Sequence, residues 1–113
     1  MKTIKILSVL LLGTLSTQMF GQKTAEAFVD KWKTQEEKAI INIVNKNGKI
    51  LGYDPAGKIA IQNFRLEDGK WKASLYDSKK DMSAEGEVYL QGNKLKIIAR
   101  KAFLTKTMYW DKN

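Results

Sequence analysis

Three consecutive stretches between residues 70 and 100 alternate apolar and polar side chains. One face of these stretches consists of Trp71, Ala73 and Leu75, then Ala84, Gly86, Val88 and Leu90, then Leu95, Ile97 and Ala99. The opposite face is mostly lysine, arginine, glutamate and tyrosine, with Ile98 as an apolar exception. Successive side chains of a β-strand point to opposite faces, so the pattern predicts three strands that are each buried on one side.

The turns between these stretches predict how the strands pair. A two-residue turn at Gly92-Asn93, a four-residue loop over residues 78–81 and a two-residue turn at Asp68-Gly69 all place inner residues opposite inner residues. The expected inner pairs are Leu90 with Leu95, Val88 with Ile97, Gly86 with Ala99, Leu75 with Ala84, Ala73 with Gly86, Trp71 with Val88, Leu66 with Trp71 and Phe64 with Ala73. A slip of one residue would turn every inner side chain outwards, so this agreement supports the register.

The remaining strands are predicted from β-branched runs and turn residues. They span residues 38–46, 49–53, 58–67 and 104–110, and a first strand is expected near Trp32 after a short helix or turn. In the last strand, Met108 is expected beside Ile97, Trp110 beside Leu95 and Lys106 beside Ala99. A phase change in the strand over residues 58–67 predicts a β-bulge near Gln62 and Asn63. About eight short strands with short connections favour an all-β, antiparallel up-and-down meander that closes into a small lipocalin-like barrel.

The beginning of the chain has the pattern of a signal peptide. Lysines at positions 2 and 5 precede an apolar run over residues 6–15, which is about 10 residues long and too short to cross a bilayer. We expect cleavage after Gly21, a single β-barrel domain over residues 22–113, and a periplasmic or secreted location. The alternative for the apolar run is a buried helix or strand. No cysteine follows the run, which excludes a lipid-anchored lipoprotein.

The composition excludes several kinds of chemistry. The chain has no histidine and no cysteine, which removes histidine-assisted serine catalysis, thiol nucleophiles and most zinc or copper sites. Glu85 and Glu87 share the outer face, but the register sets Glu85 opposite Arg100 and Glu87 opposite Lys72, so we expect surface ion pairs. The sequence therefore predicts no enzyme, no metal site and no cofactor. The formal net charge of +8 is dispersed, which predicts at most weak attraction to an anionic membrane surface and no nucleic-acid partner.

One inner layer of the predicted barrel suggests a ligand site. It contains Phe64, Ala73, Gly86, Ala99 and Lys106, and small residues there could leave space beside an inward lysine. The interpretation that we favour for this layer is that tryptophans fill the space and that Lys106 reaches water at the rim. The leading hypothesis for function is an exported, non-catalytic envelope protein that binds a small apolar or amphiphilic anion inside the barrel. Its expected ligand-binding residues are Lys106, Trp71, Phe64, Trp110 and Trp32.

A second hypothesis is a protein–protein interaction module, such as an envelope inhibitor or assembly factor. Its binding surface would be the outer face, and the apolar and aromatic residues there are Tyr76, Tyr89, Ile98 and Tyr109. A contiguous exposed apolar patch at these positions would favour an envelope protein partner over a small ligand.

Several short motifs resemble an exported bacterial family called domain of unknown function 2147. They are Lys31-Trp32-Lys33, Ile41-Asn42-Ile43, Asn47-Gly48-Lys49 with Gly52, residues 71–77 (Trp-Lys-Ala-Ser-Leu-Tyr-Asp), Leu95-Lys96-Ile97, and residues 106–112 (Lys-Thr-Met-Tyr-Trp-Asp-Lys). The chain departs from the family at Ser78, where proline is usual, and at Lys106 and Lys112, where arginine is usual. The resemblance implies a small lipocalin-like or calycin-like barrel outside the cytoplasm, and it implies no activity because the family has none established.

Overall fold

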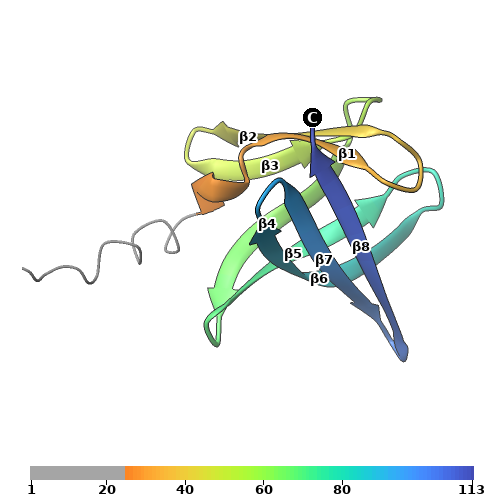
Figure 1. The fold of residues 1–113 in the computed structure, drawn as a ribbon. Helices are drawn as coiled ribbons and strands as arrows, with labels where there is room; N and C mark the ends of the chain where they lie inside the picture. The colour runs from red at the N-terminus through yellow and green to blue at the C-terminus, as the bar shows by residue number, and fades with distance from the viewer. Residues whose placement is uncertain (1–24) are drawn as a thin grey trace, which may run out of the picture.

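The computed structural model describes residues 25–113, and the predicted signal peptide lies outside the described residues. In chain order the elements are the 3-10 helix η2 (Ala25–Phe28) and the strands β1 (Asp30–Thr34), β2 (Ile40–Lys46), β3 (Lys49–Tyr53), β4 (Ile59–Glu67), β5 (Lys70–Asp77), β6 (Met82–Gln91), β7 (Lys94–Lys101) and β8 (Leu104–Lys112). Each strand pairs antiparallel with the next, and β8 pairs with β1 to close the barrel (Figure 1). The predicted all-β meander barrel is confirmed.

The predicted register of β5 to β8 is also confirmed. Every predicted inner pair between β5 and β6 and between β6 and β7 is present, from Trp71 opposite Val88 to Leu90 opposite Leu95. In the last hairpin, Met108 lies opposite Ile97, Trp110 opposite Leu95 and Lys106 opposite Ala99. Tight turns and the alternation of side chains along a strand depend on neighbouring residues, which is why the sequence was sufficient to predict this register.

The bulge in β4 lies where the phase change predicts it. Gln62 pairs with Ser74 and the ladder resumes at Arg65, opposite Lys72. Asn63 and Phe64 together therefore face Ala73, and Asn63 takes a positive φ of 60°. Two residues against one is the arrangement of a β-bulge, and it replaces the simple pair of Phe64 with Ala73 that the turn alone implied.

Side chains fill the inner layer that small residues could have left open. Trp32, Ile61, Leu95 and Ile97 are each 0% exposed. A Cβ atom added to Gly86 would lie 2.9 Å from Cδ1 of Leu75 and 3.2 Å from Cγ2 of Ile97. The space at Gly86 is thus occupied by aliphatic side chains of the neighbouring strands.

The helix η2 covers one end of the barrel, at the left of Figure 1. Phe28 is buried there, with its ring centroid 5.5 Å from that of Phe64 and 6.0 Å from that of Trp71. The Trp32 indole donates a hydrogen bond to the Phe28 carbonyl at 2.9 Å, which holds η2 against the core. Connections of a meander alternate between ends, so the turns after β2, β4 and β6 lie at the η2 end. The turns after β1, β3, β5 and β7 lie at the opposite end.

Candidate ligand-binding groove

The ladder between β3 and β4 is the shortest section of the barrel wall. These strands pair only through Gly52 with Ile61 and Tyr53 with Ile59. From Gly52 towards the η2 end, residues 49–51 have no ladder partner on β4. A groove of about 790 Å³ opens between the two strands along this stretch.

Two local features explain why the strands separate at this point. A Cβ atom at Gly52 would lie 2.4 Å from Cγ2 of Ile61, so only glycine lets β4 approach β3 this closely. Beyond Ile61 the bulge at Asn63 bends β4 away, because a bulge disrupts the ladder and increases the local twist. The groove therefore begins where the close contact ends.

Aromatic rings form the inner wall of the groove. Phe64 from β4 and Trp71 from β5 are both partly exposed there, and Phe28 packs behind them. Ile50 and Leu51 continue the apolar lining on the β3 side. A surface of this kind favours the apolar part of a ligand.

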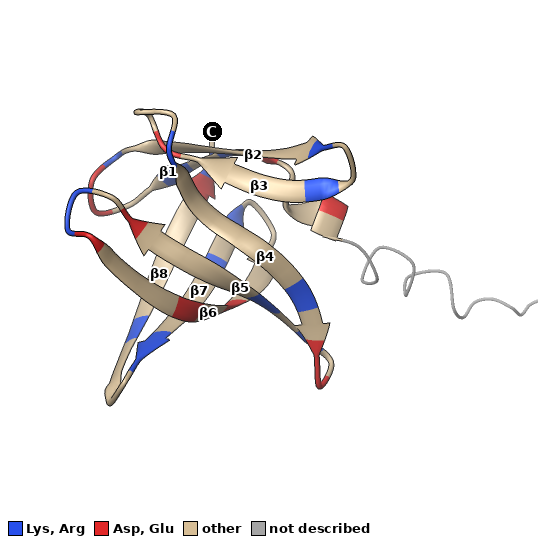
Figure 2. Ribbon diagram, turned by 180° about the vertical axis from the view of Figure 1, so that it is seen from behind, with Lys and Arg blue, Asp and Glu red and all other residues tan. Residues whose placement is uncertain are grey.

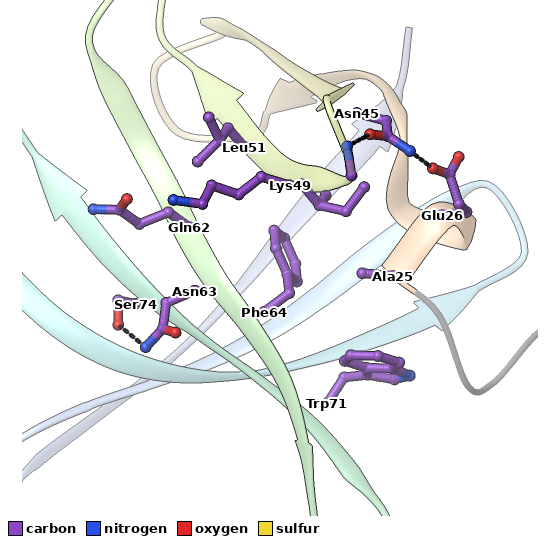
Figure 3. A pocket seen from close by; sticks show the side chains of 12 residues that line it. Ala25, Glu26, Asn45, Lys49, Leu51, Gln62, Asn63, Phe64, Trp71 and Ser74 are labelled. Atoms are coloured by element: carbon purple, nitrogen blue, oxygen red, sulfur yellow. Dashed lines mark hydrogen bonds between the residues drawn. The ribbon is translucent and has the colours of Figure 1, made fainter.

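Polar side chains surround the aromatic wall. Lys49 extends along the groove towards Gln62 (Figure 3), and none of the ion pairs formed within residues 25–113 involves Lys49. Asn63 donates a hydrogen bond to the Ser74 hydroxyl at 3.4 Å. On the η2 side, Asn45 donates to the Glu26 carboxylate and its side-chain oxygen accepts from the Gly48 amide at 2.7 Å. The groove thus combines an aromatic wall with a lysine that forms no ion pair within residues 25–113.

The structure separates the five ligand-binding residues that the sequence suggests. Phe64 and Trp71 line the groove, whereas Trp32 and Trp110 are buried in the core at 0% and 7% exposure. Lys106 lies towards the opposite end, on β8, and its ammonium is 2.9 Å from a carboxylate oxygen of Glu36. Its inner-face register is as predicted, but the side chain is 55% exposed because the end of the β7–β8 hairpin is exposed to water. Lys49 takes the position beside the aromatic residues, and no sequence signal distinguished it from the other surface lysines.

The outer-face carboxylates are held in ion pairs. Glu85 lies 2.5 Å from the Arg65 guanidinium, and the hydrogen bond from Arg65 lowers the pKa of Glu85. The Tyr89 hydroxyl and then Arg100, at 2.6 Å, lower the pKa of Glu87. The ladder sets Glu85 opposite Arg100, as predicted. Glu85 nevertheless pairs with Arg65, and Arg100 pairs with Glu87, so neither ion pair joins residues that lie directly opposite each other. Lowered pKa values keep both groups ionised, which is the opposite of what a general acid requires.

The outer-face tyrosines do not join into one apolar surface. Tyr89 and Tyr109 both lie opposite Lys96 in the ladder, so a lysine separates them. The Tyr76 hydroxyl donates to Asp81 at 2.7 Å, and Ile98 is only partly exposed. A shallow depression of about 540 Å³ on this face is lined in part by Glu85 and Arg100, and both are already held in ion pairs, Glu85 with Arg65 and Arg100 with Glu87.

Among residues 25–113, no three His, Cys, Asp or Glu side chains gather closely enough to hold a metal ion. That part of the chain also contains no helix with the length and apolar character needed to span a bilayer. Comparison of the chain with protein-family models, curated proteins and solved structures finds no significant match. The resemblance to domain of unknown function 2147 therefore stays a prediction.

Proposed function

We propose that this protein is an exported, non-catalytic binding protein whose site is the groove between β3 and β4. The observation that carries the proposal is the position of Lys49, a cation without an ion-pair partner in residues 25–113, beside an aromatic wall formed by Phe64 and Trp71. The ligand class that fits is a small apolar or amphiphilic anion. Its apolar part lies on the rings, and its head group lies at the ammonium.

Packing of the interior favours the groove over the barrel as the site. Aliphatic side chains occupy the layer around Gly86, so a ligand inside the barrel would have to displace them. The groove has about 790 Å³, within the range of roughly 300–1,000 Å³ typical of small-molecule sites. It is open to water along one side, so only part of the ligand is desolvated and we expect an affinity on the order of micromolar.

The polar lining supports an anionic head group. The Gln62 and Asn63 side-chain amides carry N–H donors, and Lys49 adds a full positive charge. Glu26 at the η2 side already accepts a hydrogen bond from Asn45, which draws that carboxylate towards β2. Paired carboxylates and the absence of histidine and cysteine support a non-catalytic role, and the basic, apolar N-terminal pattern supports export.

A second candidate ligand is an extended peptide. Residues 49–51 of β3 have no ladder partner on the groove side, and an unpaired strand edge can accept another strand through main-chain hydrogen bonds. In that case the aromatic wall would receive alternate side chains of the peptide. The protein would then be an interaction module, although its surface would be the groove and not the outer tyrosines.

The test is a titration of the purified chain, expressed without residues 1–21, with dodecanoate, dodecyl phosphate and uncharged dodecanol. The two anions are kept below their micelle concentrations, and dodecanol is kept below its solubility limit. Total tryptophan emission follows binding, because Trp71 lines the groove whereas Trp32 and Trp110 are buried in the core. We expect saturable binding of the two anions, weaker binding of dodecanol, and a loss of about tenfold in Lys49→Ala, because hydrogen bonds to charged groups contribute on this scale. Lys106→Ala is the matched control, since it removes a lysine at the opposite end, and it should bind normally.

Two outcomes decide against the small-anion proposal. Absence of saturable binding by any of the three compounds would reject it. If Lys49→Ala and Lys106→Ala weaken binding of the anions equally, then the anions are attracted to the positive surface as a whole and the groove is not the site. The peptide alternative is tested by hydrogen exchange, since an added strand protects those amides of residues 49–51 that face the groove and a small anion does not.

A further inference from the structure

The turn between β7 and β8 presents the most exposed large apolar side chains of the described chain. Phe103 is 101% exposed and Leu104 is 74% exposed. All residues from 101 to 107 are exposed, so the tip of the hairpin makes little contact with the rest of the barrel. Figure 1 shows this hairpin reaching away from the other strands at the lower right. A free phenylalanine and leucine at a tip are unusual, because apolar surface in water is unfavourable.

The residues of this turn also differ from those of the other two-residue turns. Asn47-Gly48, Asp68-Gly69 and Gly92-Asn93 contain the residues that such turns prefer, whereas β7 and β8 are joined by Ala102-Phe103. Ala102 takes a positive φ of 55°, a conformation that alanine adopts only at some cost. The chain therefore carries apolar residues at this tip instead of the residues that would form the turn best.

Positive charge flanks the apolar tip on both strands. Residues 98–107 include Arg100, Lys101 and Lys106 and no acidic residue. Lys106 and Arg100 have carboxylate partners at 2.9 Å and 2.6 Å, but both side chains remain more than half exposed. None of the ion pairs within the described chain involves Lys101. Figure 2 shows an uncharged tip between basic bands, in contrast to the acidic turn after β4.

We propose that the β7–β8 tip inserts Phe103 and Leu104 into the surface of an anionic lipid bilayer. The combination of a short apolar insert with adjacent cations is the pair of signals that peripheral membrane attachment requires. The apolar side chains enter the interfacial region, and Arg100, Lys101 and Lys106 stay at the level of the lipid phosphates. This role is separate from the groove, because the groove lies at the η2 end.

The experiment is co-sedimentation of the purified chain, expressed without residues 1–21, with vesicles made of equal parts phosphatidylcholine and phosphatidylglycerol. Pure phosphatidylcholine vesicles serve as the uncharged comparison. We expect binding to the anionic vesicles that falls at high salt, because salt screens the cations. The double variant Ala102→Asn, Phe103→Gly restores a preferred turn and should raise the thermal midpoint while it reduces partitioning about tenfold.

Matched controls separate the tip from general surface effects. Leu90→Ser removes an apolar side chain that is 45% exposed at the η2 end, and its partitioning should equal that of the unmodified chain. Lys101→Glu changes the net charge by two units and should reduce partitioning about fivefold for each unit. Lys70→Glu changes the net charge by the same amount at the η2 end and should reduce partitioning less. In a Phe103→Trp variant, the emission of the added indole, obtained by subtracting the spectrum of the unmodified chain, should shift to shorter wavelength on anionic vesicles only.

Each remaining outcome overturns the proposal. Absence of binding to the anionic vesicles rejects it outright. Equal losses in the tip variant and in Leu90→Ser, or in Lys101→Glu and Lys70→Glu, would mean that the whole surface is attracted without insertion. An unshifted emission of the added indole on vesicles that bind the protein would likewise reject insertion.

Discussion

Gly52 lies at the point where β3 and β4 meet before they separate to form the groove, so Gly52→Ala tests the geometry of the site. A Cβ atom there would lie 2.4 Å from Cγ2 of Ile61 and 3.1 Å from Cγ1 of Ile43. Carbon atoms in contact are normally about 3.5–4.0 Å apart. Ile61 is 0% exposed, and its Cγ2 is attached directly to Cβ, so it cannot turn aside without moving the core.

The expected loss of stability combines two effects. Overpacking a core usually costs about 1–3 kcal/mol, and this contact is short and rigid enough for the upper part of that range. Replacing glycine by alanine within a strand returns about 0.5–1 kcal/mol of conformational entropy. We therefore expect a net decrease in the free energy of unfolding of about 2 kcal/mol.

The assay is urea unfolding followed by tryptophan fluorescence and by circular dichroism. For a domain of this size the dependence on urea is about 1–3 kcal/mol per molar, so the midpoint should fall by roughly 1 M. Gly86→Ala is the matched control, because the added Cβ atom would lie 2.9 Å from Cδ1 of Leu75, which is the mobile end of a side chain. Its loss should stay below about 1 kcal/mol.

A double-mutant cycle gives the result that could refute this reasoning. Ile61→Ala removes the Cγ2 atom, so the double variant Gly52→Ala, Ile61→Ala should be less destabilised than the sum of the two single variants by about 1–2 kcal/mol. If Gly52→Ala is neutral or stabilising, or if the two changes are additive, then β4 does not press on Gly52. The groove would then begin at another residue.

Two further predictions concern the capped end and the outer face. Phe28→Ala should lower the free energy of unfolding by about 3–5 kcal/mol and shift tryptophan emission to longer wavelength, because it removes a buried ring that contacts Trp71. Phe103→Ala should lower it by under about 0.5 kcal/mol, because that ring is exposed. Similar losses of stability in both variants would contradict the role of Phe28 in covering the barrel end. Arg65 lowers the pKa of Glu85 below its ordinary value of 4.5, so the stability that this pair adds is present above pH 4.5 and disappears as the pH falls through the lowered pKa. Urea unfolding across this range should show Glu85→Gln less stable than the unmodified chain at neutral pH and equal to it in acid, and a constant difference would exclude the linkage.

Sequence patterns were sufficient for the sheet because the relevant information is local. The turns Asp68-Gly69 and Gly92-Asn93 connect strands that are adjacent in the chain, and the alternation of side chains then determines which residues face inwards. The bulge at Asn63 was predicted in the same way, from a change of phase within one strand. Each of these features depends on residues only a few positions apart.

The groove and the exposed tip were decided by the tertiary structure. Lys49 becomes a candidate site residue only because β3 and β4 separate between Gly52 and the η2 end, and that separation depends on the contact of Gly52 with Ile61 and on the bulge at Asn63. The register of Lys106 on the inner face was predicted correctly. The alternation of side chains along a strand does not show, however, which inner residues lie beyond the core and are exposed to water, as Lys106 is. Contacts between residues that are distant in the sequence decide how the barrel closes, where two strands separate and how far a hairpin extends. A pattern within a short stretch of sequence does not predict the combined effect of these contacts.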